Sequence, residues 1–314
     1  MFYANKLLCG IILIIGEIMN EIIKINDYTL ELINPHGYCG GVSHALNVVY
    51  NTINNPNTVK PIYLLGNLIH NKIVTNKLSQ LGVTTIDIKN KTRLELLDYI
   101  DSGTVIFSAH GVSNKVREKA TNKGLNIVDA SCGKVLLIHK KVLEYINKGY
   151  YVLYIGKPNH PEAEAILEES NNIKLITSIN DLNAKIDNKL IYVTNQTTLS
   201  LLEIDDIYNK IKELYPNALI DNNICNATTL RQKALFNLNT DLVIVVGDKL
   251  SSNSNSLVNI ARRNNIDSIL VENISDIDAN FIKKYKHISF TSGASTPEDI
   301  YLSIVDKVKE IVSK

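Results

Sequence analysis

The chain has 314 residues, of which 45% are hydrophobic and 21% are charged, a composition that excludes a disordered protein and is sufficient for two or three compact units. The formal net charge of +1, without a long basic run, argues against a nucleic-acid partner. Four cysteines are too few for a disulfide scaffold, so we expect a reducing, cytoplasmic setting.

The chain begins with an apolar segment at residues 7–16. This segment is shorter than the roughly 20 residues that a membrane-spanning helix requires, and no small-residue cleavage pattern follows it. A secretion signal is the alternative interpretation. We expect instead that residues 1–18 are an extension without function, with translation starting at Met19, and that the protein has no membrane partner.

Short apolar runs then recur along the chain and end in polar turns. They cover residues 62–65, 104–107, 151–155, 190–193, 242–246 and 287–290, and continuous apolar runs of this length indicate buried strands. Between them lie helical patterns, as where Val42, Ala45, Leu46 and Val49 share one helix face. This alternation predicts an α/β fold with parallel sheets.

The residues directly after each predicted strand are polar. Parallel sheets bind ligands beyond the carboxyl ends of their strands, so these positions are candidates for a functional site. Three histidines, three serines, one asparagine, one threonine and one glutamate occupy them: His70, His110, His160, Ser251, Ser252, Ser295, Asn253, Thr197 and Glu162.

Cysteines recur at a regular interval. Cys39, Cys132 and Cys225 are separated by 93 residues in each case, which suggests three successive units of similar α/β layout. We place the first unit at residues 19–128 with Cys39, the second at 129–221 with Cys132, and the third at 222–314 with Cys225.

Each of these cysteines precedes a helical pattern, and the helix N-terminus stabilises a thiolate there, as suits a metal ligand or a nucleophile. Three such residues, one per unit, could converge on a pseudo-threefold axis and hold an iron-sulfur cluster with one iron left open. Zinc is a weaker candidate because its paired C-x-x-C spacing is missing, and three unrelated cysteines remain an alternative. Cys9 belongs to the apolar segment and receives no role.

The polar strand-end residues are suited to an anion. Hydroxyl, amide and imidazole donors, together with helix N-terminal amides, can surround a diphosphate without arginine. Glu162 follows Pro161 at an expected helix start and could deliver protons, although a first-turn glutamate often only complements the helix dipole. Thr197 could orient a substrate hydroxyl or serve as an ordinary helix cap.

Over residues 31–300 the sequence resembles the 4-hydroxy-3-methylbut-2-enyl diphosphate reductase (LytB) family. The resemblance is specific, because many motifs match in order: Asn34-Pro35 through Val42, His70-Asn71, Ser108 through Ser113, Asp129-Ala130 with Cys132, His160-Pro161-Glu162, Gln196 through Ser200, Ile224-Cys225 with Ala227-Thr228, Arg231-Gln232, Ser251 through Ser254, and Gly293-Ala294-Ser295.

This resemblance implies three α/β domains around a central [4Fe-4S] cluster, one per chain, held by Cys39, Cys132 and Cys225 with an open fourth iron. It implies reductive dehydroxylation of (E)-4-hydroxy-3-methylbut-2-enyl diphosphate to isopentenyl and dimethylallyl diphosphate plus water, the last step of the non-mevalonate isoprenoid pathway. Glu162 and Thr197 would handle protons and the substrate hydroxyl. Thr197 would thereby also be a substrate-binding residue. The diphosphate would bind the donors His70, His110, His160, Ser251, Ser252, Asn253 and Ser295.

Two other classes share parts of this plan. A quinolinate-synthase-like [4Fe-4S] dehydratase has a similar layout but different motifs, and an iron-sulfur sensor would need neither Glu162 nor Thr197. The chain has no G-x-G-x-x-G dinucleotide fingerprint, so we expect electrons from a partner such as ferredoxin or flavodoxin. Four positions depart from the family pattern: His36 for Arg, Gly133-Lys134 for Pro-Leu, Ala165 for Gly, and Asp248 for Ser.

Overall fold

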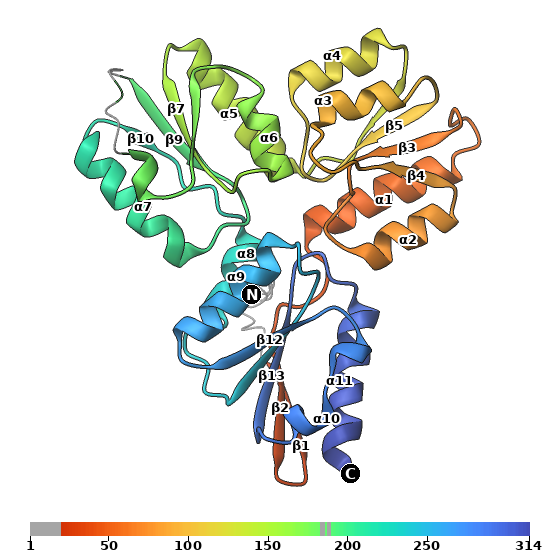
Figure 1. The fold of residues 1–314 in the computed structure, drawn as a ribbon, viewed down its shortest axis with the longest axis vertical. Coiled ribbons are helices and arrows are strands. Elements are labelled where there is room, and N and C mark those ends of the chain that lie inside the picture. The colour runs from red at the N-terminus through yellow and green to blue at the C-terminus, as the bar shows by residue number, and fades with distance from the viewer. Residues whose placement is uncertain (1–19, 183–185, 187–189) are drawn as a thin grey trace, which may run out of the picture.

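The computed structural model describes residues 20–182, 186 and 190–314 as three lobes around a common centre (Figure 1). Each lobe is built on one sheet, and helices pack on the sheet faces. The predicted α/β fold of three similar units is confirmed. The extension at residues 1–18 lies outside the described residues, and among the described residues no helix is long and apolar enough to span a membrane.

The first sheet has four parallel strands in the order β4-β3-β5-β6. They are β3 (Ile62–Leu65), β4 (Val83–Ile86), β5 (Thr104–Phe107) and β6 (Asn126–Asp129). The helices of this unit are α1 (Gly40–Asn54), α2 (Lys72–Gln80), α3 (Arg93–Leu96), the 3-10 turn η1 (Leu97–Tyr99) and α4 (Asn114–Asn122). The predicted apolar face of α1 is the buried one: Val42, Ala45, Leu46 and Val49.

The second sheet repeats this arrangement with the order β8-β7-β9-β10, again all parallel. Its strands are β7 (Tyr151–Ile155), β8 (Ile173–Ile176), β9 (Ile191–Asn195) and β10 (Leu219–Ile220). Its helices are α5 (Gly133–Asn147), α6 (Pro161–Leu167), the turn η2 (Ile179–Leu182) and α7 (Leu201–Leu214).

The third sheet takes its last strands from the opposite end of the chain. Its order is β12-β11-β13-β2-β1, built from β11 (Leu242–Val246), β12 (Asp267–Val271), β13 (His287–Ser292), β2 (Tyr28–Leu32) and β1 (Glu21–Ile25). Strand β2 runs parallel to β13, and β1 closes an antiparallel hairpin with β2. The helices are α8 (Asn226–Lys233), α9 (Ser252–Arg263), the turn η3 (Ile274–Asp276), α10 (Ala279–Ile282) and α11 (Glu298–Ser313).

Strand β2 therefore occupies the place that β6 and β10 hold in the other sheets. The prediction that residues 19–128 form the first unit is wrong at its start, because residues 21–32 pair with the third sheet. The physical reason is that an unpaired edge of β13 would leave backbone donors and acceptors unsatisfied, and β2 pairs with that edge. Each cysteine consequently lies between the last strand of one unit and the first helix of the next.

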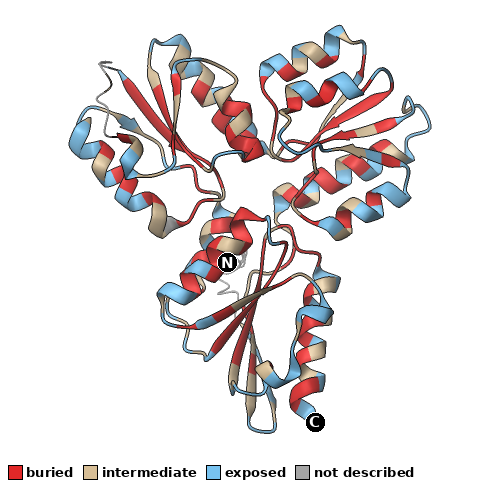
Figure 2. Cartoon of the chain, in the orientation of Figure 1, coloured by how far each residue is buried: buried red, intermediate tan, exposed pale blue. Residues whose placement is uncertain are grey.

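The sheets are apolar on both faces because helices cover both. In β11, Leu242, Ile244 and Val246 pack in one core cluster together with residues of α11. Val243 and Val245 point the other way, into a second cluster with residues of α9. Figure 2 shows this burial concentrated on the strands and on the inward faces of the helices. The carboxyl ends of the parallel strands are directed to a shared centre (Figure 1).

Candidate functional site

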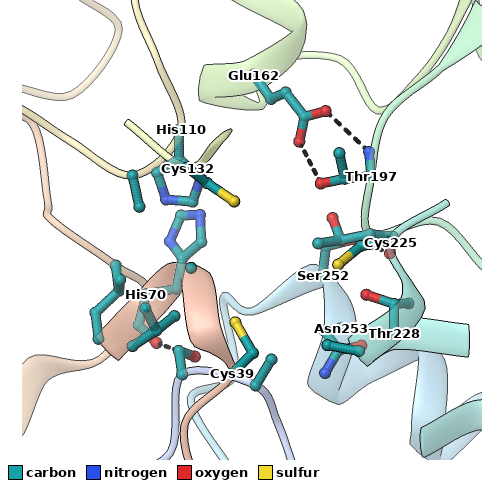
Figure 3. Close-up of a pocket in the computed structure, with 18 of the residues that line it drawn as sticks. Cys39, His70, His110, Cys132, Glu162, Thr197, Cys225, Thr228, Ser252 and Asn253 are labelled. Atoms are coloured by element: carbon teal, nitrogen blue, oxygen red, sulfur yellow. Dashed lines mark hydrogen bonds between the residues drawn. The ribbon is translucent and has the colours of Figure 1, made fainter. Parts of the chain in front are cut away.

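A cavity of about 110 Å³ lies at this centre, and its lining comes from all three units. Every site residue predicted from the sequence lines it: Cys39, His70, His110, Cys132, His160, Glu162, Thr197, Cys225, Ser251, Ser252, Asn253 and Ser295. Figure 3 shows most of them facing the same space.

The three cysteines hold equivalent positions in the three units. Each is the N-cap residue of a helix, α1, α5 or α8, and none uses its side chain as a cap. Each backbone N–H donates to a carbonyl in a loop that follows the third strand of a unit: Cys39 to Ala294 (3.0 Å), Cys132 to Ala109 (3.0 Å) and Cys225 to Thr197 (2.9 Å). The thiols are therefore fixed by backbone geometry and remain free for a ligand.

The sulfur atoms also lie near one another. A Cβ on Gly41 would lie 2.6 Å from the Sγ of Cys132 and 3.9 Å from the Sγ of Cys39, so only glycine fits between these two thiols. Burial raises the pKa of the Cys132 thiol, and the charges of Cys39 and Cys225 raise it further against the opposing N–H groups of Lys134 and Val135. Each ionised thiol makes ionisation of its neighbours less favourable. A cation bound between the thiols would remove this repulsion, so the arrangement is suited to a shared cationic centre.

Glu162 lies beside Thr197 in the cavity wall (Figure 3) and is only 2% exposed. Its Oε1 accepts hydrogen bonds from the Thr197 N–H (2.9 Å) and the Tyr154 hydroxyl (3.3 Å), while Oε2 pairs with the Thr197 hydroxyl (2.8 Å). Burial raises the pKa of Glu162 to about 7, although these hydrogen bonds oppose the shift. A carboxyl group with this pKa can hold and release a proton near neutral pH.

The three histidines form a tight cluster. Their ring centroids are 4.9 Å apart for His70 and His110, 5.8 Å for His70 and His160, and 5.5 Å for His110 and His160. Burial lowers the pKa of each: that of His160 to about 3, that of His110 well below 6.5, and that of His70 below 6.5. All three rings are therefore neutral at pH 7.

Neutral histidines with ring nitrogens within 4.8 Å of one another could also bind a metal ion. The His160 tautomer argues against this. Its Nδ1 accepts the Glu162 N–H (3.2 Å), so the proton of the neutral ring is on Nε2, which then donates and offers no lone pair. The Nε2 atoms of His70 and His110 are buried without a protein partner among the described residues. This cluster is better suited to an anion.

The remaining polar residues surround the same region. Ser251 caps α9, whose first residues are Ser252 and Asn253, so the helix N-terminus faces the cavity. Both polar atoms of the Asn253 side chain are buried and lack a partner among the described residues. Ser295 donates to the backbone oxygen of His70 (3.1 Å), which joins the third unit to the first. A helix N-terminus beside unpaired donors is a typical anion site.

The departures from the family pattern lie mostly outside this cavity. Asp248 lines a separate cavity beside Lys72 and Glu272, and its Oδ1 accepts the Leu250 N–H (2.7 Å). Its charge still acts on His70, where it partly offsets the effect of burial. His36 stacks on Tyr301 with 4.3 Å between ring centroids and contacts Glu298 at 3.0 Å.

Sequence patterns missed two buried residues near this site. Tyr154 lies in the middle of an apolar strand, where a tyrosine signals only packing. Arg231 belongs to a motif shared with the family, but the sequence alone assigns it no function. A further neighbour, Thr228, lines the cavity one turn after Cys225.

Comparisons with known proteins identify the family of the chain. The family described as "LytB protein" matches residues 30–309. The 4-hydroxy-3-methylbut-2-enyl diphosphate reductase of Geobacillus sp. (strain WCH70) is 41% identical to the chain, and the match covers 88% of this chain and 89% of that relative. The 4-hydroxy-3-methylbut-2-enyl diphosphate reductase of Symbiobacterium thermophilum is also 41% identical, and the match covers 87% of this chain and 94% of that relative.

Two solved structures share the fold. The E-1-hydroxy-2-methyl-but-2-enyl-4-diphosphate reductase from Plasmodium falciparum superposes with a TM-score of 0.82 at 32% identity, covering 88% of this chain and 86% of that one. An (E)-4-hydroxy-3-methyl-but-2-enyl diphosphate reductase, described as the terminal enzyme of the non-mevalonate pathway, superposes with a TM-score of 0.63 at 26% identity. This match covers 93% of this chain and 100% of that one. The chain belongs to the LytB family.

Proposed function

We propose that this chain is an oxidoreductase that converts (E)-4-hydroxy-3-methylbut-2-enyl diphosphate to isopentenyl and dimethylallyl diphosphate. The reaction consumes two electrons and two protons, breaks the C–O bond to the hydroxyl group and releases that oxygen as water. The observation that carries the proposal is that one cavity joins three thiols, a buried acid and a set of anion-binding donors. The relatives named for this reaction support it.

The thiol side of the cavity would hold the cofactor. Cys39, Cys132 and Cys225 would be the three protein ligands of a [4Fe-4S] cluster, which would leave its fourth iron open to the substrate. Three separate, equivalently anchored thiols are suited to a cubane cluster, whereas structural zinc sites use four closed ligands. When bound, the cluster supplies the electrons and a Lewis-acidic iron for the substrate hydroxyl.

The histidine side would hold the diphosphate. Nε2–H of His160 donates to it, and the unpaired Nε2 atoms of His70 and His110 and the amide of Asn253 lie ready to do the same. Ser251, Ser252 and Ser295 complete the set at the start of α9 and in the loop after β13. Neutral donors hold the anion without the cost of burying several protonated histidines.

Glu162 and Thr197 would handle the proton. Oε1 of Glu162 already accepts two hydrogen bonds, so the acidic proton belongs on Oε2, beside the Thr197 hydroxyl. Thr197 then accepts from Glu162 and turns its own hydroxyl proton toward the cavity. This arrangement passes a proton from a buried acid to the substrate while the walls exclude water.

The electrons come from a small redox protein such as ferredoxin or flavodoxin in the cytoplasm. Dithionite-reduced or ferredoxin-reduced protein, prepared without oxygen, should consume the allylic diphosphate and form both five-carbon products, as followed by mass spectrometry. Iron-loaded protein that leaves the substrate unchanged under reducing conditions would refute the proposal. Release of water without consumption of electrons would instead indicate a dehydratase.

A further inference from the structure

Arg231 is a buried arginine that connects the loops of two cysteines. It lies in α8 and is 2% exposed. Its Nη2 donates to the backbone oxygen of Gly37 at 2.7 Å, and its Nη1 donates to the backbone oxygen of Ala227 at 3.1 Å. Gly37 precedes Cys39 by two residues and Ala227 follows Cys225 by two, so the guanidinium lies beside the segments that carry both thiols.

This guanidinium has no carboxylate partner in the part of the chain that the structure describes. The charged groups that act on it are Cys39 and Cys225, and burial lowers its pKa against their effect. Its Nε is buried and makes no hydrogen bond to a described residue. A buried charge without a counter-ion is destabilising, which favours an anion beside it.

By contrast, the other buried arginine of the described chain has such a partner. Arg93 pairs with Glu164 at 3.2 Å and also donates its backbone N–H to the same carboxylate. At Arg231 no described carboxylate takes that place, and the groups whose charge acts on the guanidinium are Cys39 and Cys225.

We propose that Arg231 is the fixed counter-charge of the cluster and a positioning residue for its ligands, and that it holds the reduction potential of the cluster high. The inference rests on the proposed function, because it requires the cluster. A cubane cluster with three thiolates is anionic and gains another negative charge on reduction. A fixed cation beside it therefore stabilises the reduced form more than the oxidised form.

The test is the midpoint potential of anaerobically purified holoenzyme, measured by a redox titration followed by electron paramagnetic resonance. We expect Arg231→Gln to shift the potential to a more negative value. Arg231→Lys, which keeps the charge but loses the forked geometry, should stay near the parent potential. Arg262→Gln removes an exposed arginine of the same unit that donates to the Ser268 carbonyl, and it should cause no shift.

A fully loaded Arg231→Gln protein with the parent potential would overturn the proposal. So would Arg231→Lys with the same shift as Arg231→Gln, because the hydrogen bonds to Gly37 and Ala227 would then be the whole role. If Arg231→Gln binds no iron, the iron content of Arg231→Lys becomes the test. Iron binding in Arg231→Lys would support the role of Arg231 as a counter-charge, and a lysine variant that also lacks iron would contradict it. Failure of the proposed function is distinct, since the parent protein would then lack iron or turnover.

Discussion

Thr197 contacts both oxygens of the Glu162 carboxylate, with its backbone N–H 2.9 Å from Oε1 and its hydroxyl 2.8 Å from Oε2. The two residues come from different strand ends, after β9 and after β7 respectively. The carboxylate is thus held in one orientation. Its two oxygens have different surroundings, because Oε1 accepts two hydrogen bonds and Oε2 accepts one.

Replacing Glu162 by glutamine should leave substrate binding nearly intact and lower turnover. The amide has the size of the acid but delivers no proton, and a lost general acid costs about 100- to 10,000-fold in rate. Steady-state kcat, together with substrate affinity from calorimetry, measures the two effects separately. Glu168→Gln is the matched control, because this carboxylate lies at the end of the same helix and does not line the cavity. Near-normal kcat in Glu162→Gln would remove Glu162 from the mechanism.

The pH dependence of kcat should follow Glu162. Its pKa is raised to about 7, so the acid form predominates below that pH and is lost above it. We expect a plateau at lower pH and about a tenfold decrease per pH unit well above 7. The same shift has a stability consequence: the contribution of protonated Glu162 is full below the ordinary pKa of 4.5 and is lost as the pH rises through about 7. If kcat of the parent protein did not decrease above pH 7, Glu162 would not be the acid that controls turnover.

Tyr154→Phe should move the decrease of kcat with rising pH to a higher pH. The phenol donates to Oε1 of Glu162, and a hydrogen bond to the charged carboxylate lowers its pKa. Burial keeps the pKa of Tyr154 well above 10, so its hydroxyl stays a donor throughout. Tyr192→Phe is a close control, since it removes a buried phenol of the same sheet that donates to Asp221 at 3.2 Å. An equal shift in both variants would indicate a general effect of the substitutions.

His110→Asn should weaken substrate binding more than it lowers kcat. A hydrogen bond to a charged group contributes about 1.5–3 kcal/mol, which corresponds to about 10- to 150-fold in affinity. His139→Asn provides the control, because His139 is also buried but lines a different cavity. Affinity can be measured by calorimetry with the substrate or with inorganic diphosphate. Unchanged affinity in His110→Asn would exclude His110 from the diphosphate site.

The sequence predicted most central strands of the fold and missed the edge strands. Strands such as β7 and β11 are buried on both faces and read as apolar runs, whereas β4, β6, β8 and β12 lie at sheet edges and carry polar residues, and β10 is only two residues long. The pairing of β2 with β13 could not be predicted, because it links residues far apart in sequence. Local periodicity carries no information about such a pairing.

The site was predicted more completely than the fold. Residues after the carboxyl ends of parallel strands share one edge, so strand assignment alone grouped the histidines, the serines, Glu162 and Thr197. Tyr154 and Arg231 were missed because their roles depend on which side chain they meet in space. A tyrosine in a strand and an arginine in a helix look ordinary until those neighbours are known.

The central claim is that Cys39, Cys132 and Cys225 hold one cluster with an open iron, and the most direct test is Mössbauer spectroscopy of ⁵⁷Fe-labelled protein purified without oxygen. We expect four irons per chain, one of which changes its signal when the allylic diphosphate is added. Serine at any of the three positions should reduce this iron content, whereas Cys9→Ser should leave it unchanged. Zinc in place of iron, or four irons that all ignore the substrate, would contradict the claim.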